Sequence, residues 1–586
     1  MPSIDFHPEH EECPHCGARL HVQKTCDKTV VTMDIGPFVA KETVLQCPRD
    51  QAVFTSNALH ALTPVQGTFG FDVIEHVGRA LFVSCRTERE VMIELAARNV
   101  PISEREIGYL GRKFVIYLAL AHRESHEQLR RSLLRSGGYI LHVDGTCEGG
   151  SPHLFCGLDG ISQWVLDSIK IPSEKKELLV PFFRRIEQHY GTPLALVNDM
   201  GAGILAAIAE VFPGVPDFIC HFHFLRDIGK DLLLQDYQGL TQGLRGHNVR
   251  PLLRQKAKYF EKKVTENSQT LTELKISVES GQLKAASLVP IPAIIAYALI
   301  HWAFEAPRQS RGLGFPFDRP HVEFFRRLKH VHALLAQIRH IQLRNQAEDN
   351  RPLFQLWQLL EGVVQDKALN ETVARLESKA VVFDKLRQAL RIALPESKNG
   401  LNDNGEDTDI QTIEKNVREF RNWLQCDECR QKTYTKMIEQ IDKYWDKLFA
   451  DPIVVHTPDG TCIIVPQRTN NILESFFRGE KRKGRKKTGT ASLTKTLKTI
   501  LADTPLVRNL KHEQYCQIIL NGCATLAERF SQIDAKLVQE QLKQANNNHE
   551  RIPQEVKKMI GHSDLPERIS ALLMPPSNID ANRDLR

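Results

Sequence analysis

Two aspartates stand where buried strands are expected to end. Asp144 closes the apolar run 139–143, and Asp199 follows the run 194–198. Continuous runs of this kind are typical of strands buried on both faces of a parallel sheet. A carboxylate at such a strand end lies at the carboxyl edge of the sheet, where open α/β sheets place their sites. Neighbouring strands are about 4.8 Å apart, so the two carboxylates repel unless a cation lies between them. The pair predicts a metal site.

The elements around the two aspartates follow a regular order. Three strands in a meander are followed by alternating helices and strands, which is compatible with parallel pairing of the first and fourth strands through right-handed crossovers. The expected strands are 139–145, 153–158, 164–171, 193–199 and 217–223, and the expected helices are 174–190, 203–211 and one that begins at about 224.

This order resembles the ribonuclease H-like fold, and four local matches resemble the DDE transposases of the Mutator-like group. Asp144 lies in Val-Asp-Gly-Thr, and Asp199 lies in Asn-Asp-Met-Gly. Cys220 and His223 form a Cys-x-x-His pair, which is similar to a signature of the group. Glu474 lies in Thr-Asn-Asn-Ile-Leu-Glu-Ser-Phe-Phe-Arg, which is similar to the group's glutamate helix.

The resemblance implies a two-metal mechanism of phosphoryl transfer. Asp144, Asp199 and Glu474 would be the catalytic carboxylates and would hold two Mg²⁺ (or Mn²⁺) ions, which clamp the attacking and leaving oxygens of an in-line displacement. Water first frees a 3′-OH at the end of the element, and this hydroxyl then attacks target DNA. Cys220 and His223 would brace the sheet behind the site.

Glu474 lies far along the chain from Asp199, beyond a Leu-rich region that reads as all-helical. The family accommodates such a gap through a helical domain inserted before the glutamate helix. The expected fold is therefore an α/β ribonuclease H-like core interrupted by a large all-α insertion, with a small N-terminal zinc-ribbon-like β unit and helical N- and C-terminal regions. Glu480 is the nearest alternative to Glu474, and Glu148 and Asp159 are the weaker alternatives near the first strand.

Six regions follow from this pattern. They are a zinc-ribbon-like unit (1–60), a helical region that could bind DNA or serve packing (61–137), the first part of the core (138–232), the all-helical insertion (233–460), the glutamate helix with a basic segment that completes the core (461–510), and a helical C-terminal region with a polar tail (511–586).

The N-terminal cysteines have the spacing of metal ligands. Cys13 and Cys16 form a tight knuckle that aims both sulfurs at one point, and Cys47 begins a second knuckle whose last cysteine position is occupied by Asp50. Cys26 or a nearby histidine could supply the fourth ligand. We expect one structural Zn²⁺; the alternative is a degenerate ribbon that has lost its metal.

A dense basic segment follows Glu474. A charge run of this kind is usually a solvated face or a localisation signal, but beside a carboxylate site that must hold DNA it favours backbone contacts. Such contacts are salt-sensitive and carry no sequence information. The seven expected DNA-backbone residues are Arg478, Lys481, Arg482, Lys483, Arg485, Lys486 and Lys487.

Composition limits the class of protein. With 42% hydrophobic and 25% charged residues the chain matches an ordinary soluble protein, and 13 cysteines in 586 residues are too few for a disulfide scaffold. The longest apolar stretch, 288–304, contains two prolines and is shorter than the about 20 residues of a membrane span. We expect an intracellular protein, in a bacterial nucleoid or a nucleus.

The combined hypothesis is a homodimeric DNA transposase that nicks the terminal inverted repeats of its element and joins them to target DNA. The first alternative is a ribonuclease H-like nuclease that cleaves without strand transfer. The second is a domesticated transposase that acts as a DNA-binding protein.

Overall fold

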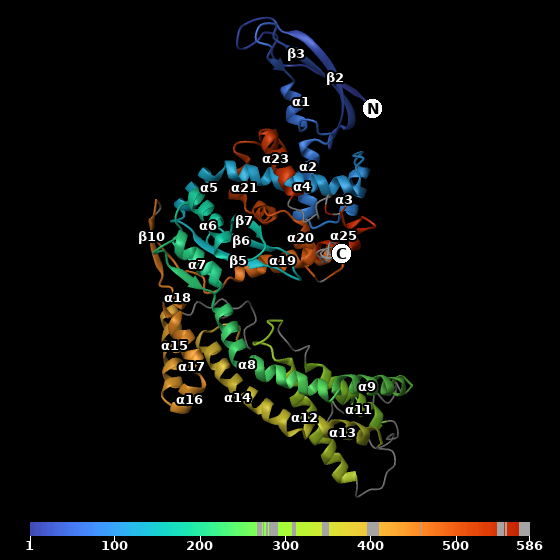
Figure 1. The fold of residues 1–586 in the computed structure, drawn as a ribbon, viewed down its shortest axis with the longest axis vertical. Helices are drawn as coiled ribbons and strands as arrows, with labels where there is room; N and C mark the ends of the chain where they lie inside the picture. Colours follow the sequence, from blue (N-terminus) through green and yellow to red (C-terminus); the bar gives the residue numbers. More distant parts are fainter. Residues whose placement is uncertain are drawn as a thin grey trace, which may run out of the picture.

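The structure is a computed structural model with three visibly different parts: an N-terminal sheet, a central sheet covered by helices, and a helical part (Figure 1). It describes residues 1–266, 291–306, 312–342, 351–394, 409–458, 460–490, 492–547 and 559–573, together with Thr272, Lys275, Ile276, Glu279 and Val556. Among the helices of these residues, none has the length and apolar character needed to cross a membrane.

The N-terminal sheet is built on a long antiparallel hairpin of β2 (His21–Thr32) and β3 (Gly36–Gln46). β1 (Ser3–Phe6) lies parallel to β3, and β4 (Val53–Phe54) pairs with the end of β3. The hairpin turns just before β3, which starts at Gly36, and the φ of 76° at this residue suits a glycine. After α1 (Asn57–Leu62), the chain enters the central part. The hairpin projects away from the other parts (Figure 1).

The central sheet has five strands in the order β7-β6-β5-β8-β9. β5, β6 and β7 form an antiparallel meander, whereas β5, β8 and β9 are parallel. The expected meander and the parallel pairing of the first and fourth strands are therefore confirmed. The elements are β5 (Ile140–Thr146), β6 (His153–Asp159), β7 (Val165–Ile171), α6 (Lys176–Tyr190), β8 (Ala195–Asn198), α7 (Ala202–Val211) and β9 (Asp217–Ile219).

One hydrophobic core joins this sheet to helices from both ends of the chain. His122, which is buried in α4, lies 2.8 Å from the hydroxyl of Tyr515 and 3.0 Å from the carbonyl oxygen of Leu166. The region 61–137 and the C-terminal residues up to Ala545 thus contribute to one core with the sheet, and the long helix α4 is a core helix. Before the sheet lie α2 (Phe71–Gly78), a π-helical turn (Arg79–Val83), α3 (Glu88–Ala97), α4 (Glu104–Glu124) and α5 (His126–Arg135).

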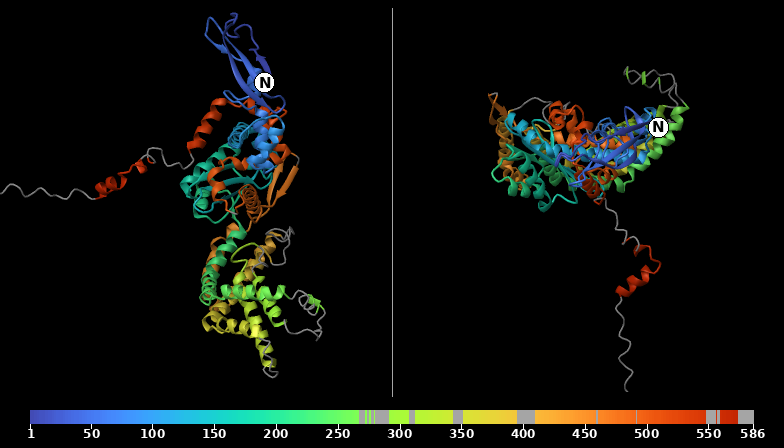
Figure 2. Two further views of the ribbon diagram at one scale, coloured as in Figure 1. Left: turned by 90° about the vertical axis from the view of Figure 1, so that its right-hand side faces the viewer. Right: turned by 90° about the horizontal axis from the view of Figure 1, so that it is seen from above.

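The helical part has a second core of its own. The long helix α8 (His221–Gly246) begins at the central sheet and runs into this part, so it connects the two (Figures 1 and 2). The other helices are α9 (Val249–Thr265), α11 (Ile291–Phe304), α12 (Pro320–Gln342), α13 (Arg351–Val364), α14 (Lys367–Ala389), α15 (Ile410–Gln425), α16 (Glu428–Thr433), α17 (Thr435–Lys443) and α18 (Trp445–Leu448).

The chain returns to the central sheet through a β-hairpin of β10 (Ile453–Thr457) and β11 (Gly460–Ile464). The expectation that 233–460 is all-helical is wrong at its end, because the strand β10 lies within that range. Ile453 of β10 and Ile464 of β11 pack beside Ile140 and Val197 of the sheet. The helices that follow are α19 (Asn471–Thr488), α20 (Thr494–Thr499), the 3₁₀ helix η4 (Thr504–Lys511), α21 (Glu513–Leu520), α22 (Leu526–Ser531), α23 (Ala535–Asn547) and α25 (Leu565–Leu573).

Of the expected C-terminal region, residues 548–555, 557–558 and 574–586, which include the polar tail, lie outside the described residues.

Candidate functional site

Asp144 and Asp199 lie at the carboxyl ends of two neighbouring parallel strands, β5 and β8. The last paired residues of the two strands are His142 and Val197. Each aspartate comes two residues later in its strand direction, so the two lie on the same edge. Asp144 is buried, and its Oδ1 accepts a hydrogen bond from its neighbour's backbone N–H (2.8 Å). Oδ1 of Asp199 is buried and has no hydrogen-bond partner among the described residues. The edge therefore holds one buried carboxylate oxygen that no hydrogen bond from the described residues satisfies.

Burial and mutual repulsion disfavour the charged forms of these carboxylates. Burial raises the pKa of Asp144 well above its usual value, and the charges of Asp199 and Glu474 raise it further. Burial raises the pKa of Asp199 to about 6, and the next contribution comes from Glu174. The pKa of Glu474 is also raised by burial, although two nearby arginines oppose this. A bound cation would relieve the repulsion.

Glu474 reaches the edge because Asn470 fixes the start of α19 against β5. Asn470 is fully buried; its Nδ2 donates to the carbonyl oxygen of Val143 (2.9 Å), and its Oδ1 accepts from Nδ1 of His142 (2.9 Å). The backbone N–H of Glu474 donates to the carbonyl oxygen of Asn470 (2.9 Å). The glutamate helix is thus bonded to the strand residues immediately before Asp144.

Cys220 joins three of these elements. Its backbone N–H donates to the carbonyl oxygen of Asn198 (2.7 Å), and its Sγ accepts from the backbone N–H of Asn470 (3.3 Å). The expected strand over 217–223 is confirmed only over its first three residues, because β9 ends at Ile219 and α8 begins directly after Cys220. Cys220 is therefore the residue that precedes the helix, and His223 lies in its first turn. The expected bracing role fits this geometry.

The imidazole of His223 faces Glu474, with 3.9 Å between Nε2 and Oε1. Burial, together with the smaller effects of the charges of Arg226 and Lys230, lowers the pKa of His223 to about 3. The ring is therefore neutral at physiological pH and adds no charge to the site.

Two residues at this edge were missed from the sequence. Glu174 lies just before α6, where its Oε1 is 2.9 Å from Nδ1 of His153 and its charge raises the pKa of both Asp144 and Asp199. Arg226 lies in α8, lowers the pKa of Asp199 and Glu474, and has a buried Nε without a hydrogen-bond partner among the described residues. Had the helix been expected to start at 221, the sequence would have placed Arg226 at the site, because Arg226 is three positions after His223 and residues three apart share a helix face.

The alternative carboxylates have other roles. Glu480 is paired with Lys483 (2.7 Å), and Glu148 accepts from the backbone N–H of Leu493 (3.0 Å). Asp159 is fully buried and accepts three backbone N–H groups, from residues 140, 161 and 162. Of Glu474 and its three alternatives from the sequence, Glu474 is thus the carboxylate beside the aspartates.

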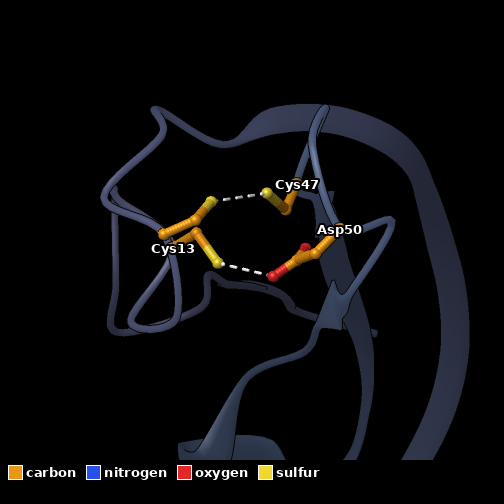
Figure 3. Close-up of side chains that lie close together, drawn as sticks. Cys13, Cys47 and Asp50 are labelled. Carbon is orange, nitrogen blue, oxygen red and sulfur yellow. Dashed lines mark hydrogen bonds between the residues drawn. The ribbon is translucent and has the colours of Figure 1, made fainter.

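A second candidate site lies at the end of the N-terminal sheet. Within the described parts of the chain, Cys13, Cys16, Cys47 and Asp50 are the only group of three or more potential ligands whose donor atoms all lie within 4.8 Å of one another. Figure 3 shows the side chains converging. The fourth member is Asp50, which corrects the expectation of Cys26 or a histidine. This cluster could hold a metal such as zinc.

The three carboxylates of the acidic edge are not spaced as closely as the ligands of the cysteine cluster. Asp144, Asp199 and Glu474 do not meet the 4.8 Å spacing, so their side chains must turn toward a shared ion before they can hold it. The donor set is nonetheless suited to Mg²⁺, which takes a few carboxylate oxygens together with water and substrate phosphates. The unpartnered oxygen of Asp199 is a free ligand atom of this kind.

The cations of the basic segment are distributed over two faces of α19. Arg478, Lys481, Arg482, Arg485 and Lys486 are exposed. Two further cations face the protein instead. Lys483 binds Glu480, and Lys487 lies 5.5 Å from the ring centre of Phe82, where burial lowers its pKa. Of the seven residues expected to contact DNA, five are thus exposed and two are partly buried, and the DNA contact itself stays a prediction.

No protein-family model matches the sequence, and no curated protein matches it. The resemblance to Mutator-like transposases stays a prediction.

Proposed function

We propose that the protein is a DNA transposase of the DDE type, which nicks DNA at the ends of its element and transfers the new 3′-OH to target DNA. The observation that carries the proposal is the meeting of Asp144, Asp199 and Glu474 at one sheet edge, although a whole helical part separates the last two in the chain. In this interpretation the central sheet is a ribonuclease H-like core, and α8 to α18 form the insertion. The mixed strand order supports this assignment.

The acidic edge would hold Mg²⁺ through Asp144, Asp199 and Glu474. Bound there, the ions would polarise a scissile phosphate and stabilise the developing charge. The chain's own groups would do the positioning: Asn470 fixes Glu474 against β5, and Arg226 supplies a cation to a phosphate oxygen at the same edge. No covalent protein nucleophile is required.

The outer face of α19 supports DNA as the substrate. Its exposed cations begin one turn after Glu474, so a strand lying along them would pass directly over the carboxylates. We further propose a homodimer, because both ends of an element have to be joined together.

The test uses the purified chain, Mg²⁺, and DNA that carries the repeats flanking its own gene. Wild type should cut the ends and join them to a target plasmid, and Asp199→Ala should do neither. Asp217→Ala is the matched control, because Asp217 is another carboxylate of the same sheet but is paired with Lys447 (2.7 Å). We expect this control to cut normally.

The products separate the alternatives. Cleavage without joined product identifies a nuclease, and DNA binding without cleavage identifies a DNA-binding protein. Equal cleavage by wild type and Asp199→Ala would overturn the assignment of the site.

A further inference from the structure

The first knuckle of the N-terminal sheet is a closed turn with a defined hydrogen-bond pattern. The backbone N–H of Cys13 donates to the carbonyl oxygen of Ala18 (2.8 Å), and that of Gly17 donates to the carbonyl oxygen of Cys13 (2.8 Å). Gly17 has a φ of 67°, in the left-handed region. This turn brings Cys16, three residues after Cys13, to the same side as Cys13.

The second turn repeats this pattern residue by residue. The backbone N–H of Cys47 donates to the carbonyl oxygen of Ala52 (2.9 Å), and that of Gln51 donates to the carbonyl oxygen of Cys47 (3.1 Å). Gln51 adopts a φ of 61° even though it is not glycine. Asp50 therefore occupies the position in the second turn that Cys16 occupies in the first. A turn kept in this form without its second cysteine indicates that Asp50 itself is the ligand.

The four side chains meet at the end of the sheet, where Cys13 and Cys47 are buried, Cys16 is partly exposed and Asp50 is exposed. Cys13 and Cys47 are 2% and 0% exposed. Sγ of Cys13 lies 3.2 Å from Oδ2 of Asp50, as Figure 3 illustrates, and the sulfurs of Cys16 and Cys47 are 3.5 Å apart. Sulfur and carboxylate oxygen at these distances can become four ligands of one tetrahedral ion.

We propose that Cys13, Cys16, Cys47 and Asp50 bind one structural Zn²⁺, with Asp50 as the fourth ligand. Binding replaces the thiol hydrogens, which are released as protons. Iron–sulfur clusters are held mainly by cysteines, so the carboxylate favours zinc. The inference does not depend on the proposed function, because the site is on a different sheet from the acidic edge.

The metal has a structural task. The core around the knuckles consists of Cys13, Leu20 and Cys47 with a few partly buried neighbours, which is too small to hold the two turns together alone. Zinc would fasten the loop before β2 to the turn after β3. Without it, we expect the end of this sheet to open while the central sheet stays folded.

The experiment measures zinc in the full chain after dialysis and its affinity by competition with a chromophoric chelator. We expect one zinc per wild-type chain. Asp50→Ala should weaken binding by at least the about 10–100-fold that loss of an outer-shell partner costs, and Asp50→Cys should strengthen it. Cys26→Ser, which removes the rival thiol, and Asp27→Ala, which removes a carboxylate elsewhere on β2, should leave the affinity unchanged.

Cobalt substitution gives a readout that does not require Asp50→Ala to fold. The thiolate-to-cobalt absorption of Asp50→Cys should exceed that of wild type by about one third, because one thiolate is added to three. A wild-type chain that holds no zinc, an Asp50→Ala chain with wild-type affinity, or a Cys26→Ser chain that loses the metal would each overturn the proposal.

Discussion

Replacing Asp199 by asparagine should stabilise the protein in the absence of metal ions. The side chain keeps its size, but it loses a charge that the folded structure disfavours. The pKa of Asp199 is about 6 in the folded protein, against a usual value of 3.8. This difference corresponds to about 3 kcal/mol at neutral pH. The charge of Asp199 also raises the pKa of Asp144, so removing this charge stabilises the folded protein further.

The sign of the effect depends on pH. A carboxyl group with a raised pKa in the folded state binds its proton more tightly there than in the unfolded chain. Its penalty is absent below pH 3.8, grows as the pH rises, and is complete above about 6. Asp199→Asn should therefore unfold several degrees above wild type at pH 7.5 in EDTA. The two proteins should approach each other at pH 4.

Thermal unfolding followed by circular dichroism measures this directly. Asp217→Asn is the matched control, because Asp217 is a carboxylate of the same sheet that is paired with Lys447 (2.7 Å). Asparagine cannot keep this ion pair, so the control should not unfold above wild type at pH 7.5. If Asp199→Asn unfolds below wild type at pH 7.5, Asp199 is a structural residue and the electrostatic reasoning is wrong.

Three other substitutions probe the site and its surroundings. Asn470→Ala leaves two buried partners unsatisfied, so chemical denaturation should show that the free energy of unfolding falls by about 1–3 kcal/mol. DNA cleavage should also fall, because Glu474 loses its anchor. Cleavage at the wild-type rate would contradict the anchoring role. Arg226→Gln should slow single-turnover cleavage about 100-fold with little change in DNA affinity; an affinity loss without a rate loss would place Arg226 outside the reaction. The double variant Arg482→Gln/Arg485→Gln should lower the slope of log affinity against log salt by about 2, measured by fluorescence anisotropy, whereas Lys483→Gln on the inner face should leave the slope unchanged.

The sequence predicted the central sheet well because its strands are buried on both faces. The runs that end at Asp144 and Asp199 are continuous and apolar, which leaves little ambiguity about element type. The buried face of helix α19 was harder to predict, because a basic stretch within the helix interrupts the apolar pattern that would mark that face. Lys483 and Lys487 look like surface cations in the sequence. In the structure Lys483 is paired with Glu480 of the same helix, and Lys487 is paired with Glu88 of α3.

Three features depended on contacts that a linear pattern does not carry. The start of α8 is set by Cys220, whose N–H and sulfur are both used by distant residues. The strand β10 forms because β11 returns to pair with it. The spacing placed Asp50 at the last cysteine position of the second knuckle, but only the meeting of the two turns shows that its carboxylate joins the three cysteines. In each case tertiary contacts decided what local residue types left open.

The central claim is that three distant chain segments share metal ions at one sheet edge. Iron(II) can replace magnesium in such sites, and with ascorbate and peroxide it generates hydroxyl radicals that cut the polypeptide near the bound ion. We predict cuts near Asp144, Asp199 and Glu474 together, suppressed by excess Mg²⁺ and absent in Asp199→Ala. Cuts at only one of these segments, or an unchanged pattern in the variant, would contradict the shared site.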